Sequence, residues 1–175
     1  NSQIIAQFKT GNDGETSKLY LLGQNQENFK SITVNGYGLE TQWSSDGDKL
    51  LYSAHNSTTD HKPQLYIVDA AGDAIGYNHH SLNLNTWADK CIFSNNTTVY
   101  CAVPKELPYG ANYVPEIADE IADYIYKIDV QSGVKSFVAE PQIGYTIDKM
   151  QVSDDGTYLY FTDKNNQYLH MIQLK

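Results

Sequence analysis

A short apolar and aromatic segment recurs four times along the chain and constrains the fold more than any other feature. The copies are residues 18–23 (KLYLLG), 64–69 (QLYIVD), 124–129 (YIYKID) and 168–173 (YLHMIQ). Successive copies start about 45 residues apart, and once about 60. Short runs rich in Tyr, Ile, Leu and Val are typical of β-strands. A repeat of about 40–45 residues is the length of one four-stranded sheet in a radially repeated all-β fold.

A second repeated segment precedes the first and marks a hairpin. It reads WSSDG at 43–47, FSNN at 93–96 and VSDDG at 152–156, and a strand-like run follows each copy. Asp-Gly between two strand-like runs favours a tight turn, because Gly accepts the positive φ that such turns need. Together the two segments predict a series of small antiparallel sheets, with the chain beginning and ending inside a sheet.

The recurring strands are apolar on both faces. Leu65 and Ile67 alternate with Tyr66 and Val68, whereas a strand with one solvated face alternates apolar and polar residues. We therefore expect each sheet to be packed between two neighbours, as the blades of a β-propeller are. A two-sheet sandwich is the structural alternative, but it does not explain the repeating order of the segments.

We predict one all-β domain over 1–175, a partial β-propeller of about four blades. Two complete four-stranded blades are flanked by two incomplete ones. The blade parts are residues 3–36, 37–80, 87–141 and 146–175, with an insertion at 104–123. Because a partial propeller exposes blade faces and strand edges, we expect it to belong to a larger propeller or to self-associate through its exposed blade edges.

Two segments carry a resemblance to known propellers. Residues 44–52 (SSDGDKLLY) and 153–161 (SDDGTYLYF) resemble the blade signature of TolB-like and WD-repeat-like propellers, which also occurs in prolyl-oligopeptidase-type peptidases. Residues 90–94 and 99–108 are similar to uncharacterised exported propeller proteins of candidate-phyla bacteria. The resemblance covers nearly the whole chain and implies a fold, without an activity. TolB-like propellers usually have six to eight blades, which again implies a larger propeller.

The charge of the chain excludes some classes of partner. Its formal net charge is -9, and Lys and Arg neither dominate nor cluster, which argues against a nucleic-acid partner. No run approaches the roughly 18 apolar residues of a membrane span, and no basic start followed by an apolar block marks a targeting segment. We expect neither nucleic-acid binding nor membrane insertion.

Cys91 and Cys101 are predicted to face each other across a hairpin. The hairpins align on Trp43, Phe93 and Val152 in one strand, and on Leu50, Val99 and Leu159 in the other. Cys91 and Cys101 then each lie two residues from the aligned position of their own strand. Residues two steps from a facing pair face each other again. A disulfide there would add about 2–3 kcal/mol and imply an extracytoplasmic location: cell surface, periplasm or secreted. Two buried thiols are the alternative.

The insertion is the best candidate for a binding surface. It separates a second from a third strand, and we expect it on the same rim as the connector 81–88. Pro115 predicts a short helix through Ala122, with Ile117 and Ile121 on one face and an acidic outer face.

Aromatic and acidic residues of these two loops form the predicted partner-binding set, with the tyrosines as anchors. The set is Trp87, Tyr109, Tyr113, Glu116, Asp119 and Glu120. The alternative interpretation is a surface loop whose acidic face is solvated and has no binding role.

No motif for catalysis, a metal or a cofactor is found. His55 and His61 flank a loop and could converge, but no Cys or carboxylate completes a metal spacing, and we interpret the histidines as solvated. Ser132 and Lys135 match SerXXLys, but in a turn rather than at a helix start. GXSXG, HEXXH, CXXC and phosphate-cradling glycine loops are absent.

The expected function is a non-catalytic propeller module for interaction or scaffolding in an exported or cell-surface protein, with a protein partner that the sequence does not identify. The alternative is an accessory propeller of a secreted hydrolase or peptidase, whose catalytic domain lies outside this chain. A carboxylate-dependent propeller enzyme is disfavoured. It needs two carboxylates about 5–10 Å apart in a cleft, whereas the acidic residues cluster on one predicted helix.

Overall fold

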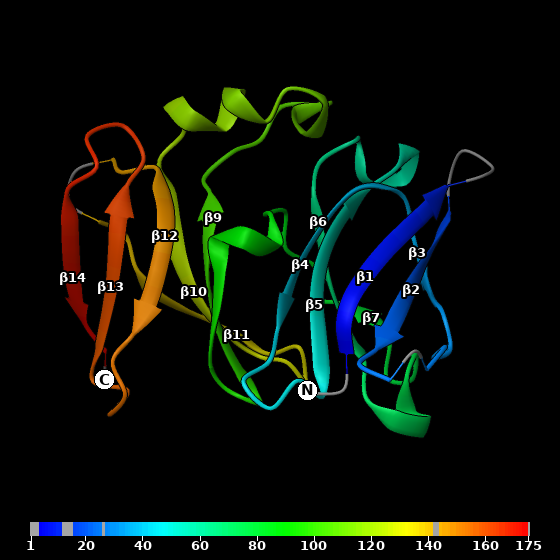
Figure 1. The fold of residues 1–175 in the computed structure, drawn as a ribbon. Coiled ribbons are helices and arrows are strands. Elements are labelled where there is room, and N and C mark those ends of the chain that lie inside the picture. Colours follow the sequence, from blue (N-terminus) through cyan, green and yellow to red (C-terminus); the bar gives the residue numbers. More distant parts are fainter. Residues whose placement is uncertain (1–3, 12–15, 26, 142–143, 175) are drawn as a thin grey trace.

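The computed structural model describes residues 4–11, 16–25, 27–141 and 144–174. Within these residues the fold is all-β, and the strands form four small antiparallel sheets that stand side by side (Figure 1). Two sheets have four strands and two have three. The predicted fold class, two complete blades flanked by two incomplete ones, is confirmed. We number the sheets blade 1 to blade 4 in chain order.

Blades 1 and 2 take up the first half of the chain. Blade 1 has the order β1-β2-β3 and blade 2 the order β4-β5-β6-β7. The strands are β1 (Ile4–Gly11), β2 (Ser17–Gly23), β3 (Ile32–Val34), β4 (Tyr37–Trp43), β5 (Lys49–His55), β6 (Gln64–Asp69) and β7 (His80–Ser81). Two short 3₁₀ helices, η1 (Ser57–Thr59) and η2 (Gly72–Ala74), lie in the connections of blade 2.

Blades 3 and 4 follow in the same order, and the first strands of blades 2, 3 and 4 lie next to one another (Figure 1). Blade 3 has the strand order β8-β9-β10-β11, and blade 4 the order β12-β13-β14. The strands are β8 (Cys91–Asn95), β9 (Thr98–Pro104), β10 (Asp123–Asp129), β11 (Lys135–Ala139), β12 (Ile147–Val152), β13 (Tyr158–Asp163) and β14 (Leu169–Gln173). The 3₁₀ helix η3 (Ala88–Lys90) enters β8, and η4 (Ala111–Tyr113) and η5 (Pro115–Glu120) lie between β9 and β10.

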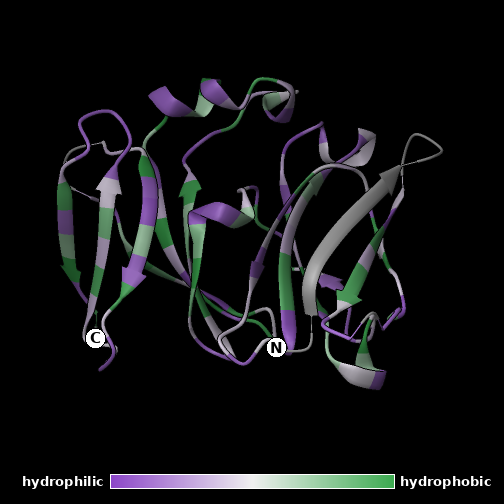
Figure 2. Ribbon diagram, in the orientation of Figure 1, coloured by the Kyte–Doolittle hydropathy of each residue, from purple (hydrophilic) through white to green (hydrophobic). Residues whose placement is uncertain are grey.

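The sheets are packed face to face, as the two-sided apolar strands predict. In β6, Tyr66 and Val68 join the apolar cluster shared with blade 1, whereas Leu65 and Ile67 join the cluster shared with blade 3. A third cluster, which includes Leu159 and other buried residues, fills the space between blades 3 and 4. In blade 4, the last sheet of the stack, hydrophobic and hydrophilic residues alternate along β12 and β13 (Figure 2), as expected for strands with one face less covered. The two-sheet sandwich is therefore not the fold.

The repeated Asp-Gly segments form two matching loops. In blade 2 the Ser44 hydroxyl donates to Asp46 Oδ1 (2.6 Å) and accepts from the Lys49 N–H (2.9 Å). In blade 4 Ser153 makes the equivalent bonds to Asp155 (2.6 Å) and from Tyr158 (2.9 Å). The predicted hairpin is confirmed, with Gly47 and Gly156 at φ values of 74° and 70°. The turn is longer than expected, because five residues separate β4 from β5, and the serine and aspartate side chains close the loop.

The predicted register of the hairpins is confirmed. Cys91 pairs with Cys101, and the aligned positions pair in the same way, Thr41 with Tyr52 and Met150 with Phe161. The two Cα atoms of Cys91 and Cys101 are 4.1 Å apart, and the sulfurs are joined in a disulfide. No helix in the described part of the chain is long and apolar enough to cross a membrane.

Candidate functional site

The insertion lies across one rim of the fold, above blades 2, 3 and 4, at the same end as η1 (Figure 1). Its helical part differs from the prediction. It is the 3₁₀ helix η5, which ends at Glu120, and Ile121 is already extended. Because the 3₁₀ helix has three residues per turn, Ile117 and Ile121 do not share a face. Ala118 is buried instead, and Ile117 is exposed.

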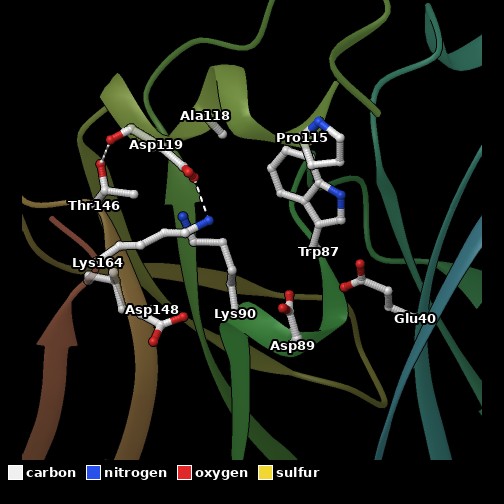
Figure 3. A pocket seen from close by; sticks show the side chains of 11 residues that line it. Glu40, Trp87, Asp89, Lys90, Pro115, Ala118, Asp119, Thr146, Asp148 and Lys164 are labelled. Carbon is white, nitrogen blue, oxygen red and sulfur yellow. Dashed lines mark hydrogen bonds and ion pairs between the residues drawn. The ribbon is translucent and has the colours of Figure 1, made fainter. Parts of the chain in front are cut away.

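Trp87 lies beneath the insertion and anchors it. Its side chain is 5% exposed and forms a small cluster with Leu107, Ala111, Ala118 and Ile121. Figure 3 shows its ring beside Pro115. The prediction of Trp87 as a partner contact is therefore corrected, because its buried ring packs against the insertion. The insertion and the connector 81–88 lie on the same rim, as expected.

Backbone hydrogen bonds attach the insertion to blade 2. The Gly110 N–H donates to Asp60 O (2.8 Å), and the Asn112 N–H donates to His61 O (3.1 Å). Both acceptors belong to the loop that follows η1. Because these bonds involve main-chain atoms, they fix the path of the insertion and not merely its side chains.

Contacts with blade 4 hold the other end of the insertion. The Thr146 hydroxyl lies 2.9 Å from Asp119 O and 3.0 Å from Ile121 O. Lys164 Nζ forms an ion pair with Asp119 Oδ1 at 2.6 Å (Figure 3). The insertion thus bridges blades 2 and 4, and Asp119, predicted as a partner contact, has an intramolecular partner.

The outer side of the insertion presents aromatic, apolar and acidic side chains to solvent. Tyr109 is 71% and Tyr113 62% exposed. Val114, Ile117, Glu116 and Glu120 are also exposed. We call these six residues the rim patch. It brings together four of the six predicted partner-binding residues, and two apolar neighbours, Val114 and Ile117, that the sequence analysis did not include in that set.

A small cavity lies under the insertion, where the first strands of blades 2, 3 and 4 meet. Its volume is about 80 Å³. Its carboxylates come from four different elements: Glu40 of β4, Asp89 of η3, Asp119 of η5 and Asp148 of β12 (Figure 3). Glu116, Asp119 and Glu120 do share one helix, η5, as expected, but further carboxylates gather beside Asp119 because distant strands converge here.

Glu40 is the electrostatically unusual residue of this cavity. Burial and the neighbouring Asp89 carboxylate raise the pKa of Glu40 to about 7, whereas Lys149 opposes the rise. The Oε2 atom of Glu40 is buried and has no hydrogen-bond partner within the described residues. Glu40 consequently exchanges its proton close to neutral pH.

Two of the histidines are not the solvated loop residues that the sequence suggested. His55, at the end of β5, is only 4% exposed, and its Nδ1 lies 3.4 Å from His61 Nδ1. Among the described residues no group of three or more His, Cys, Asp or Glu is placed to hold a metal ion.

The sequence analysis missed Glu40, Asp89 and the buried pair Lys90–Asp123. The signal that could have found Asp89, Lys90 and Asp123 is positional, since each lies at or just before the start of a β-strand. Glu40 lies in the middle of β4, beside the register shift between Tyr37 and Glu40. No local motif distinguishes them from solvated charges.

Comparison with known proteins supports the fold alone. No protein-family model matches the chain, and no curated protein matches it. A solved structure from Bacteroides fragilis, provisionally described as a 6-phosphogluconolactonase, has a propeller-like fold. It is 12% identical, with a TM-score of 0.54, over 91% of this chain and 44% of its own length. This chain therefore spans less than half of that protein.

The β-propeller domain of Cps50 (Swd1) from Myceliophteria thermophila is 10% identical over 98% of this chain and 75% of that domain. Its TM-score of 0.34 is too low to carry an argument.

Proposed function

We propose that this chain is a non-catalytic β-propeller module that binds a protein partner through the rim patch. The observation that carries the proposal is the exposure of Tyr109 and Tyr113 on an insertion that main-chain hydrogen bonds hold in place. Exposed aromatic side chains on a rigid support are favourable anchors, because little conformational entropy is lost when they become buried.

The chemistry of the rim patch indicates what the partner presents. Apolar contacts from Tyr109, Tyr113, Val114 and Ile117 suit an apolar segment. The carboxylates of Glu116 and Glu120, on a chain of net charge -9, suit flanking Lys or Arg, which would steer the encounter. The proposed partner is therefore a protein segment with an apolar centre and basic flanks.

A peptide-display selection against the wild-type chain tests the proposal. We expect enriched peptides to combine apolar and basic residues, and to bind Tyr109→Ser and Tyr113→Ser at least about tenfold more weakly, a loss of about 1.4 kcal/mol for each variant. Tyr77→Ser is the matched control, since Tyr77 is equally exposed at 62% but lies outside the insertion. Peptides that bind all variants equally would refute the role of the rim patch.

The cavity under the insertion does not support a competing enzymatic function. Pockets for small molecules usually measure roughly 300–1,000 Å³, whereas this cavity measures about 80 Å³. Its carboxylates are better explained as groups that join three blades.

The proposed location is extracytoplasmic, since a disulfide is typical of oxidising compartments. The alternative role, an accessory propeller attached to a hydrolase or peptidase, uses the same surface. The reading frame of the parent gene decides between them, because that role requires a catalytic domain in the same polypeptide.

A further inference from the structure

Two histidines and a tyrosine from three separate elements converge at the junction of blade 2 and the insertion. His55 ends β5, His61 follows η1, and Tyr113 ends η4. His61 Nδ1 lies 3.4 Å from His55 Nδ1 and 2.9 Å from the Tyr113 hydroxyl. The ring centroid of Tyr113 lies 5.1 Å from the ring centroid of His55 and 4.9 Å from that of His61.

A hydrogen bond from the Tyr113 hydroxyl to His61 Nδ1 accounts for one of these contacts, but not for the close approach of the two imidazole nitrogens. A neutral imidazole nitrogen offers either one hydrogen or one lone pair, so His61 Nδ1 cannot make a full hydrogen bond to both of its partners. At 3.4 Å, the contact between the two nitrogens is also longer than the usual 2.7–3.2 Å for a bond donated by nitrogen. A cation shared by all three atoms removes this conflict.

The separation of the two imidazole nitrogens matches a tetrahedral metal site. Two nitrogens that each lie about 2.0–2.1 Å from a Zn²⁺ ion in tetrahedral geometry are about 3.3–3.4 Å apart. The observed separation is 3.4 Å. The Tyr113 oxygen can complete this geometry by a small movement, because its side chain is exposed. Water can occupy the fourth position, as it does in open zinc sites.

The backbone holds His61 in a conformation that residues with a Cβ rarely adopt. Asp60 and His61 have φ values of 55° and 53°, in the left-handed region that costs a non-glycine residue energy. Asn56 stabilises this loop. Its side-chain oxygen accepts from the N–H groups of Thr58 and Thr59, and its main-chain carbonyl oxygen accepts from the His61 N–H at 3.0 Å. The His61 ring thus lies beside His55 on a loop whose backbone is conformationally strained.

We propose that His55 Nδ1, His61 Nδ1 and the Tyr113 oxygen form a binding site for one divalent transition-metal ion, with Zn²⁺ as the reference ion. Two imidazoles and one oxygen donor suit zinc and copper better than magnesium or calcium. The bound ion would link β5, the loop after η1 and η4, and so hold the insertion on blade 2. This site does not depend on the existence of a protein partner.

Calorimetric titration with Zn²⁺ tests the proposal on the whole chain. We expect one ion bound per chain, with affinity reduced more than about 100-fold in His61→Gln, since loss of a direct ligand costs more than loss of an outer-shell partner. Tyr113→Phe should weaken binding by about tenfold, a smaller loss than in His61→Gln, because water can replace the phenol oxygen. His80→Gln is the control, because His80 lies at the start of β7, where its Nδ1 is 2.8 Å from Asn78 O, and it is not part of the proposed site.

Circular dichroism establishes that each variant is folded, and a thermal melt gives an independent readout. An ion that binds only the native state stabilises that state. Zn²⁺ should therefore raise the Tm of the wild type and of His80→Gln, but not the Tm of His61→Gln. Wild type that binds no Zn²⁺, or His61→Gln that binds as well as wild type, would overturn the site. An unchanged affinity in Tyr113→Phe would remove the phenol from the ligand set and overturn the three-donor assignment. Tyr113→Phe keeps the aromatic anchor of the rim patch, so this result is separable from partner binding.

Discussion

Lys90 Nζ lies 2.7 and 2.9 Å from the two carboxylate oxygens of Asp123, and this ion pair is buried near the rim that carries the insertion. The Asp123 side chain is fully buried, and that of Lys90 is 9% exposed. Asp123 Oδ2 also accepts from the Ile147 N–H at 2.7 Å. One carboxylate therefore joins η3, β10 and β12, and fixes blade 4 against blade 3. Burial raises the pKa of Asp123, and Lys90 opposes that rise.

Removal of either partner of this pair should destabilise the fold strongly. We expect Lys90→Met to lower the free energy of unfolding by about 3–5 kcal/mol, because it leaves an unpaired carboxylate in the interior. Urea denaturation measures this loss. The double variant Lys90→Met with Asp123→Asn should recover part of it, since neither buried charge remains. A single variant as stable as wild type would contradict the central role of the pair.

Glu40 should make stability depend on pH. Its folded-state pKa of about 7 lies above its ordinary value of 4.5. Its contribution is therefore fully present below about pH 4.5 and is lost as the pH rises through 7. After a discount for its partial exposure, the loss is about 1 kcal/mol. Comparison of urea midpoints at pH 5 and pH 8 should show this loss in wild type and not in Glu40→Gln. Equal pH dependence of the two proteins would exclude Glu40 as its source.

Reduction of the Cys91–Cys101 disulfide should lower the free energy of unfolding by about 2–3 kcal/mol, since the sequence separation is 10 and the closed loop is short. Intact-mass measurement after alkylation reports the redox state, and denaturation with and without reductant reports the stability. The variant Cys91→Ala with Cys101→Ala controls for effects of the reductant, because it has no bond to lose. Two alkylatable thiols in unreduced protein would contradict the assignment.

Trp87→Ala should destabilise the fold by about 3–5 kcal/mol and loosen the insertion, because it opens a cavity beneath Ala111 and Ala118. Limited proteolysis detects the second effect as faster cleavage within 105–121. Tyr77→Ala offers a control, as it removes an exposed aromatic ring away from this cluster. Unchanged proteolysis in Trp87→Ala would show that the insertion is held without it.

The stacking of sheets and the hairpin register could be predicted because they depend on local repeats. Leu65 and Tyr66 on opposite faces of one strand suffice to indicate two covered faces. The alignment of the hairpins on Phe93 in one strand and Val99 in the other suffices to place Cys91 opposite Cys101. Both inferences use the two-residue period of a strand.

The central carboxylates could not be predicted from such patterns, and of the histidine pair only the possibility that His55 and His61 converge could be, not its geometry. Glu40 and Asp89 meet only because three blades converge, and their sequence separation leaves no local sign of it. His55 and His61 converge because Asp60 and His61 adopt positive φ values, which no propensity argument anticipates for these residues. The burial of Trp87 follows from the insertion folding over it, which is again a tertiary effect.

Amide hydrogen exchange of the insertion is the most direct test of the central claim, that a preformed binding surface is fixed on the rim of stacked blades. The account predicts that the Gly110 and Asn112 amides, which donate to Asp60 and His61, exchange about as slowly as amides of the adjacent strands β9 and β10. Exchange of both amides at the rate of an unstructured loop, in a protein whose strands remain protected, would contradict it.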